Sequence, residues 1–97
     1  MRLGDFDAAA PPVGLAPPLQ ALWWLKKGGL LTGPEWERAH EICQRGEGRR
    51  EYDLVHALAH WIEGDLGNSD YWYRRAGARR TAPDVAGEWE HLARTLG

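Results

Sequence analysis

The chain has 97 residues, a formal net charge of −2 at pH 7 and a single cysteine, Cys43. This length fits one small domain, and the near-neutral charge argues against a nucleic-acid binder, which typically has a strongly basic domain. The lone cysteine excludes an intramolecular disulfide, and no apolar run approaches the ~20 residues of a membrane span. We therefore expect a cytoplasmic protein without membrane or nucleic-acid association.

The N-terminal segment, residues 1–17, is rich in alanine and proline and lacks the continuous apolar stretch of a secretory signal. Such a composition favours a flexible or extended segment over a long helix. We expect residues 18–97 to form a single helical domain. Its first helix is predicted to begin at Pro18, a suitable first helical residue, and to stop at Gly28.

A second helix is predicted over residues 34–44. Before it, Thr32 and Glu35 have the spacing of a capping box. One face of this helix carries residues that recur at the helical period, namely Trp36, Ala39, His40 and Cys43. The cysteine on this face is expected to be a small buried hydrophobe.

The third helix is predicted over residues 51–63 and is ended by Gly64. Asn68 or Ser69 is expected to cap a fourth helix that runs to Ala76. About half of the circumference of the third helix is apolar, with Leu54, Val55, Leu58, Ala59, Trp61 and Ile62.

A fifth helix is predicted over residues 83–96, where Thr81 and Asp84 have the spacing of an acidic capping box. It carries a regular apolar stripe of Val85, Trp89, Leu92 and Leu96. No segment alternates with a period of two residues for long enough to predict a strand. The predicted fold is therefore all-α, with about five helices.

The second and fourth predicted helices begin alike when Trp36 is placed opposite Leu66, which indicates a weak internal repeat. Around the fourth helix, the turn and small-residue pattern consists of Gly64, Asp65, Ser69, Tyr73 and Ala76. This pattern resembles a tetratricopeptide-type repeat, a pair of antiparallel helices. The resemblance covers residues 51–77 and implies two antiparallel helical hairpins, followed here by a C-terminal closing helix. The segment EGDLGNSDYWYRRAG also resembles a group of short uncharacterised bacterial proteins, which supplies no catalytic residues.

Two histidines, His56 and His60, lie one turn apart on the third predicted helix, beside Glu63. This spacing lets two imidazoles meet one metal ion, and zinc accepts both histidine and carboxylate ligands. His40 on the second helix can supply a further ligand if the two helices pack antiparallel. These four residues are the candidate ligands of a divalent metal.

Two other interpretations of the histidine face stay open. The amphipathic pattern of the third helix places Asp53, His56, His60 and Glu63 in one polar stripe, which would be exposed to solvent. The tetratricopeptide register instead places both histidines where two paired helices pack, as buried, hydrogen-bonded imidazoles. A helix flanked on two sides would satisfy both patterns.

The sequence contains no glycine-rich phosphate loop and no nucleophilic triad, so we do not expect an enzyme, and no cofactor other than a divalent metal is indicated. We expect a binding or interaction module with a protein partner, and a homodimer is its simplest form. Its candidate anchors are Trp61, Trp72, Arg74 and Arg75. The alternative is a small metal- or ligand-binding protein, and a third interpretation is phosphate or RNA contact through residues 74–80.

Overall fold

A computed structural model describes residues 3–97. They form five helices: α1 (Pro17–Lys27), α2 (Pro34–Arg45), α3 (Arg50–Ile62), α4 (Leu66–Arg75) and α5 (Val85–Leu96). Helices comprise 61% of this part of the chain and it contains no strand, so the predicted all-α fold is confirmed. None of these helices is long and apolar enough to cross a membrane.

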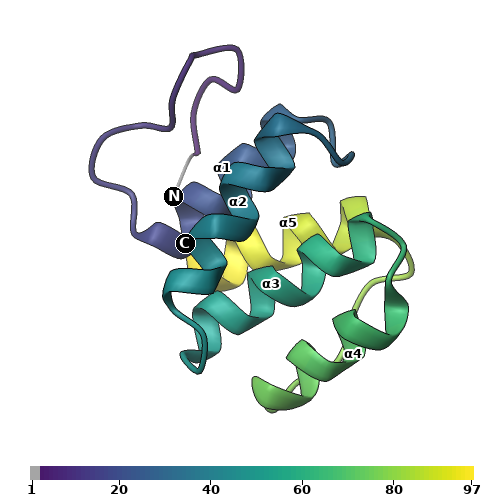
Figure 1. Cartoon of the computed structure of the whole chain (residues 1–97). Helices are drawn as coiled ribbons and strands as arrows, with labels where there is room; N and C mark the ends of the chain where they lie inside the picture. Colours follow the sequence, from purple (N-terminus) through teal and green to yellow (C-terminus); the bar gives the residue numbers. More distant parts are fainter. Residues whose placement is uncertain (1–2) are drawn as a thin grey trace.

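Helix α3 is the centre of the molecule (Figure 1) and contacts each of the other four helices. Helix α1 packs mainly on α2, and α3 packs mainly on α4, which gives the two predicted helical pairs. The closing helix α5 packs across α3 and α1. Because α3 is surrounded, every residue from Asp53 to His60 is buried, whatever its polarity.

Tryptophans join the helices through their indole N–H groups as well as through their rings. Trp36 of α2 donates to the carbonyl oxygen of Ala59 in α3 at 2.8 Å. Trp89 of α5 donates to the carbonyl oxygen of Leu22 in α1 at 2.7 Å. Each bond satisfies a buried polar group, so each indole docks its helix at one defined position.

The N-terminal segment packs against the helices from residue 3 onward. Leu3 and Leu15 are buried, and the ring of Phe6 lies 6.1 Å from that of Trp23 and 5.9 Å from that of Trp89. These contacts cover the core where α1 meets α5. Residues 1–2 of the predicted flexible segment lie outside the described residues.

The predicted cap of α4 is wrong. Asp65, not Asn68 or Ser69, is the N-cap, and its Oδ1 accepts a hydrogen bond from the backbone N–H of Asn68 at 3.2 Å. Ser69 is instead buried and donates to the carbonyl oxygen of Ala57 at 2.7 Å. The helix thus begins closer to the turn than predicted, because the aspartate of the turn is itself a good cap.

Two predicted capping boxes are also corrected. Helix α2 has Gly33 as its N-cap without a side-chain cap, because Pro34 takes the first helical position, so Thr32 and Glu35 form no capping box. Helix α5 is capped by Asp84, whose Oδ1 accepts from the backbone N–H of Gly87 at 2.8 Å. Thr81 lies outside that helix.

A buried carboxylate, Glu88, fastens α5 to the loop that precedes it. One oxygen, Oε1, accepts from the N–H and the hydroxyl of Thr81 at 3.0 and 2.9 Å and from the N–H of Ala82 at 3.0 Å. The other, Oε2, accepts from the hydroxyl of Tyr73 in α4 at 2.7 Å. Burial alone would raise the pKa of Glu88, but these hydrogen bonds outweigh burial and hold the pKa below its usual value.

Candidate metal centre

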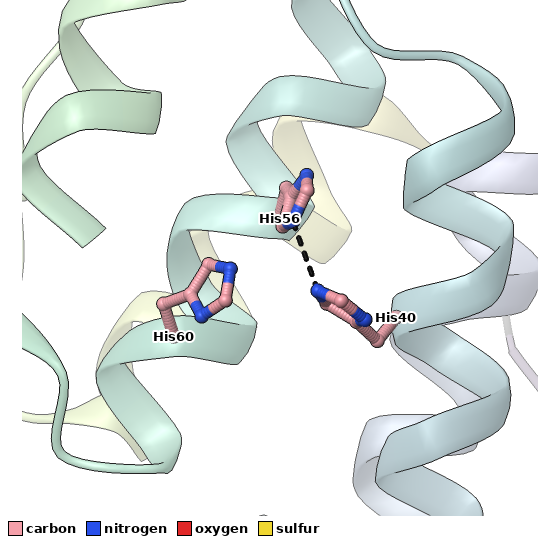
Figure 2. A group of neighbouring side chains, drawn as sticks. All are labelled: His40, His56 and His60. Atoms are coloured by element: carbon pink, nitrogen blue, oxygen red, sulfur yellow. Dashed lines mark hydrogen bonds between the residues drawn. The ribbon is translucent and has the colours of Figure 1, made fainter. Parts of the chain in front are cut away.

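Three imidazoles meet between α2 and α3 (Figure 2). His40 comes from α2, and His56 and His60 come from consecutive turns of α3. The Nε2 atoms of His40 and His56 are 3.1 Å apart, within hydrogen-bonding distance. One nitrogen of each ring lies within 4.8 Å of a nitrogen of each of the others. We call these three residues the histidine cluster.

Two tryptophan rings form the walls of the histidine cluster. Trp36, one turn before His40 on α2, stacks on its ring at a centroid distance of 4.9 Å. Trp72 of α4 stacks on His56 at 4.0 Å. Because Trp36 is also bonded to the backbone of α3, the two helices cannot slide past each other without breaking the cluster.

The orientation of His60 is set by a carboxylate. Its Nδ1 lies 2.5 Å from Oε2 of Glu63, and a carboxylate only accepts, so Nδ1 carries the proton. The Nε2 atom of His60 then presents a lone pair, and its neighbour is the side-chain amide nitrogen of Asn68 at 3.4 Å. A carboxylate that fixes the tautomer of a histidine in this way is the usual outer partner of a metal-binding imidazole.

The burial of His56 leaves one of its nitrogens unsatisfied. Its side chain is 2% exposed, and its Nδ1 has no hydrogen-bond partner among the described residues. Whichever ring donates across the contact between His56 and His40, this Nδ1 is still unpaired. An unpaired buried polar nitrogen costs roughly 1–3 kcal/mol, and the described residues hold two others, Nε1 of Trp23 and Nε of Arg80.

The electrostatics favour the neutral forms of two of the three imidazoles, those of His40 and His56. Burial, and then the proximity of His60 and His40, lower the pKa of His56 to about 3. Burial and His60 also lower the pKa of His40, although Glu37, Glu63 and Glu47 pull it in the other direction. Neutral imidazoles are the form that binds metals, and nearby carboxylates favour a positive charge at this position.

The lowered pKa of His56 predicts that the metal-free protein loses stability in mild acid. The unfolded chain takes up a proton near the ordinary value of 6.5, whereas the folded protein resists protonation down to about 3. The free energy of unfolding should therefore fall as pH drops below 6.5, by up to about 1.4 kcal/mol per pH unit. Urea denaturation between pH 7 and 5 measures this slope. The slope should shrink in His56→Gln and persist in His91→Gln, and equal slopes in all three proteins would contradict the assignment.

The spacing of the histidine cluster suits a tetrahedral ion. Zinc–nitrogen bonds of ~2.0–2.1 Å place two ligand nitrogens ~3.3 Å apart. The Nε2 atoms of His40 and His56 are already at 3.1 Å, and the third nitrogen lies within 4.8 Å. The His60 nitrogen would have to move closer to the other two to complete the site. Glu63 fits an outer position behind His60 rather than a direct ligand position.

The solvent-exposed interpretation of the histidine face is wrong, because the side chains of His56 and His60 are 2% and 6% exposed. Asp53 is buried too, but its Oδ1 accepts from the backbone N–H of Gly48 at 3.1 Å, so it does not join the cluster. Cys43 is fully buried, as predicted, and burial raises the pKa of its thiol, which makes a thiolate ligand unfavourable.

The candidate interaction residues lie in different environments. Trp72 is buried against His56, and Trp61 is half-buried, with the guanidinium of Arg80 4.8 Å from its ring centre. Arg74 and Arg75 are exposed at the end of α4. The two arginines, and not the two tryptophans, are thus available at the surface.

Three contributors to the site were not predicted from the sequence. Trp36 and Trp72 were seen as core and surface residues, although their rings enclose the imidazoles. Asn68 was expected to be a helix cap, and it instead contacts His60. In the sequence, Trp36 lies one helical turn before His40, and Asn68 lies across a turn from His60. These two positions were the only available indication that the residues contribute to the site.

No protein-family model, no curated protein and no solved structure matches this chain. The tetratricopeptide resemblance therefore stays a prediction, and the histidine cluster is the feature of this chain that points to a function.

Proposed function

We propose that this protein binds a first-row transition-metal ion, zinc above all, through His40, His56 and His60, with Glu63 orienting His60. The observation that carries the proposal is the convergence of three imidazole nitrogens, from two helices, within 4.8 Å of one another. Neutral imidazoles suit zinc, copper and nickel better than calcium or magnesium, which prefer oxygen ligands.

The alternative explanation, a core that happens to contain histidines, accounts less well for the same contacts. Apolar side chains would fill the volume between Trp36 and Trp72 without bringing two imidazole nitrogens within 3.1 Å of each other. A core packed only with apolar side chains would also not require Glu63, whose carboxylate contacts His60. A bound cation uses the lone pairs of the cluster and gives the nearby negative charges a partner.

The position of the site couples metal binding to the fold. Two ligands come from α3 and one from α2, so an ion would join these helices near the contact between Trp36 and Ala59. A metal that binds only the folded chain stabilises it, and the stabilisation grows with the free metal concentration. Three protein ligands would leave the fourth position of a tetrahedral ion for water or another ligand.

A zinc titration of untagged, chelator-treated protein tests the proposal. Calorimetry near pH 7 should show saturable binding of one zinc ion per chain. Little net proton release is expected, because a neutral imidazole that donates through Nε2 keeps its proton on Nδ1 when Nε2 binds the metal. The fluorescence of Trp36 and Trp72 should change with the same midpoint, and the melting temperature should rise. Calcium and magnesium should have no such effect.

The matched control for the titration is His91→Ala, which removes a half-buried histidine of α5 outside the cluster. This variant should bind zinc as the wild type does. Absence of saturable zinc binding by the wild-type protein, or an equal loss of binding in the His91→Ala variant, would refute the proposed site.

A protein-interaction function is the second candidate. On the outer side of α4, Tyr71 is 43% exposed, and its hydroxyl accepts from Nη1 of Arg75 at 3.1 Å. Tyrosine and arginine are common anchors of protein interfaces. The other large exposed apolar residues, Val13, Leu31 and Leu66, are separate in the sequence, and single apolar surface residues are ordinary. A protein partner, a homodimer and a cytoplasmic location stay predictions.

A further inference from the structure

A second polar cavity lies away from the histidine cluster. It has a volume of about 280 Å³ and lies between the start of α3, the loop after α4 and the second half of α5. This is just below the ~300–1,000 Å³ of ordinary ligand pockets, so it suits a small molecule. Its polar lining consists of Arg50, Arg79, Thr81, Glu88, His91 and Thr95.

The two arginines of this cavity have no partner among the described residues. In residues 3–97, the one ion pair between an arginine or lysine and a carboxylate joins Arg80 to Asp70. Neither Arg50 nor Arg79 donates a hydrogen bond to another described side chain or backbone oxygen. Two solvent-exposed arginines from different elements therefore line one cavity with their hydrogen-bonding capacity free.

Glu88, the carboxylate in the lining, does not neutralise the positive charge of the two arginines. Both oxygens of Glu88 are engaged by Tyr73, Thr81 and Ala82, as described above. Those hydrogen bonds stabilise its ionised form without a cation. The arginines are therefore not needed to neutralise Glu88, and the cavity still has a positive lining.

A third arginine, Arg75, lies near the start of α3 but outside the lining of the cavity. Helices α3 and α4 run antiparallel, since Ala57 meets Ser69 and His56 meets Trp72, so the end of α4 lies beside the start of α3. This brings the exposed Arg75 close to Gly48, just before α3. Because the carboxylates of Glu47 and Asp53 act on Arg75, the anion site depends on Arg50 and Arg79.

We infer that the cavity between α3 and α5 binds a small phosphate-bearing anion through Arg50 and Arg79. A planar guanidinium matches the oxygens of a phosphate with two parallel hydrogen bonds, and the imidazole of His91 and the hydroxyl of Thr95 are further donors. The size of the cavity fits inorganic phosphate or a small phosphomonoester. It leaves no room for a nucleotide polymer, so an oligonucleotide is not the expected ligand.

The test is a titration of metal-free protein with inorganic phosphate and with phenyl phosphate, followed by amide NMR shifts and equilibrium dialysis. Metal-free protein makes the result independent of the histidine cluster. We expect saturable binding, with the largest shifts at Arg50, Ala78, Leu92 and Thr95, which surround the cavity. Stronger binding of phenyl phosphate would identify a phosphomonoester as the ligand, and equal binding would identify free phosphate.

Variants decide whether the cavity is responsible. The double variant Arg50→Gln/Arg79→Gln should bind about 10- to 100-fold more weakly, the usual loss when charged hydrogen bonds are removed. The exposed Arg74, outside this cavity, provides the control Arg74→Gln, which should bind as the wild type does. If the double variant is unstable, the single variant Arg79→Glu gives a second test, because residue 79 lies in a loop. It should also bind phosphate more weakly than the wild type. The inference would be overturned if phosphate binding does not saturate or if Arg74→Gln loses as much affinity as the double variant. Preferential binding of a single-stranded oligonucleotide would also overturn it.

Discussion

The His40→Ala variant is expected to lose tight zinc binding while it keeps its fold. His40 provides one of the three nitrogens of the histidine cluster, and its Nε2 lies 3.1 Å from that of His56. Loss of a direct ligand should weaken binding by more than the ~10- to 100-fold that loss of an outer partner costs. Because His40 is only half-buried, its removal should cost the metal-free protein about 1 kcal/mol. Competition with a chromophoric chelator measures the affinity, and urea denaturation measures the stability.

A series of variants distinguishes the direct metal ligands from Glu63, which orients a ligand. Glu63→Gln keeps an acceptor near His60 but removes the charge, so its zinc affinity should fall between those of the wild type and His40→Ala, by ~10- to 100-fold. His91→Ala should be unchanged. Wild-type affinity in His40→Ala would show that zinc binds elsewhere, for instance at the carboxylates of Glu63 and Asp65, which also lie near His60.

The Glu88→Ala variant is expected to be the most destabilising substitution of a charged residue in this chain. Glu88 is 1% exposed, and its loss leaves the N–H groups of Thr81 and Ala82 and the hydroxyl of Tyr73 without their acceptor. Breaking a buried hydrogen-bonded group of this kind costs about 3–5 kcal/mol, a large part of the stability of a small domain. Urea denaturation monitored by circular dichroism measures the loss.

The control for this prediction is Glu90→Ala, an exposed glutamate on the same helix, which should change stability by less than about 0.5 kcal/mol. Glu88→Gln, which keeps one acceptor oxygen, should lie between the two and is the variant to measure if Glu88→Ala does not fold. Similar stabilities for Glu88→Ala and Glu90→Ala would show that the buried carboxylate contributes little.

Local sequence patterns were sufficient to predict the five helices. Regular apolar spacing, with glycine or proline near the ends, identified each helix to within about two residues of its observed bounds, and the exception was the start of α4. The helix caps were less predictable, because several residues near each start were chemically able to cap. Asp65 caps α4, whereas the hydroxyl of Ser69 donates to the carbonyl oxygen of Ala57. That contact depends on the packing of two helices.

The residues of the candidate site were predictable, but their orientation was not. The spacing of His56 and His60 placed them on one face of α3, and a neighbouring His40 was identified from its helix. Periodicity alone could not show which face is buried, because α3 is covered on all sides. Helices pack on more than the two sides of α3 that would satisfy both sequence patterns, since all four other helices contact it.

Two polar features depended on contacts that no local pattern reveals. Glu88 lies beside the apolar stripe of α5, where a charged residue would normally face solvent, and its partners Tyr73 and Thr81 come from other parts of the chain. The stacking of Trp72 on His56 joins α4 to α3 in the same way. Such contacts are set by the tertiary packing and require the folded structure.

The most direct test of the metal site is a crystal structure of the zinc-loaded protein with anomalous scattering measured at the zinc absorption edge. We predict one strong peak between α2 and α3, at ~2.0–2.1 Å from one nitrogen each of His40, His56 and His60. Glu63 should still be bonded to Nδ1 of His60. A peak at any other position, with the three imidazoles arranged as they are without zinc, would contradict the proposed metal centre.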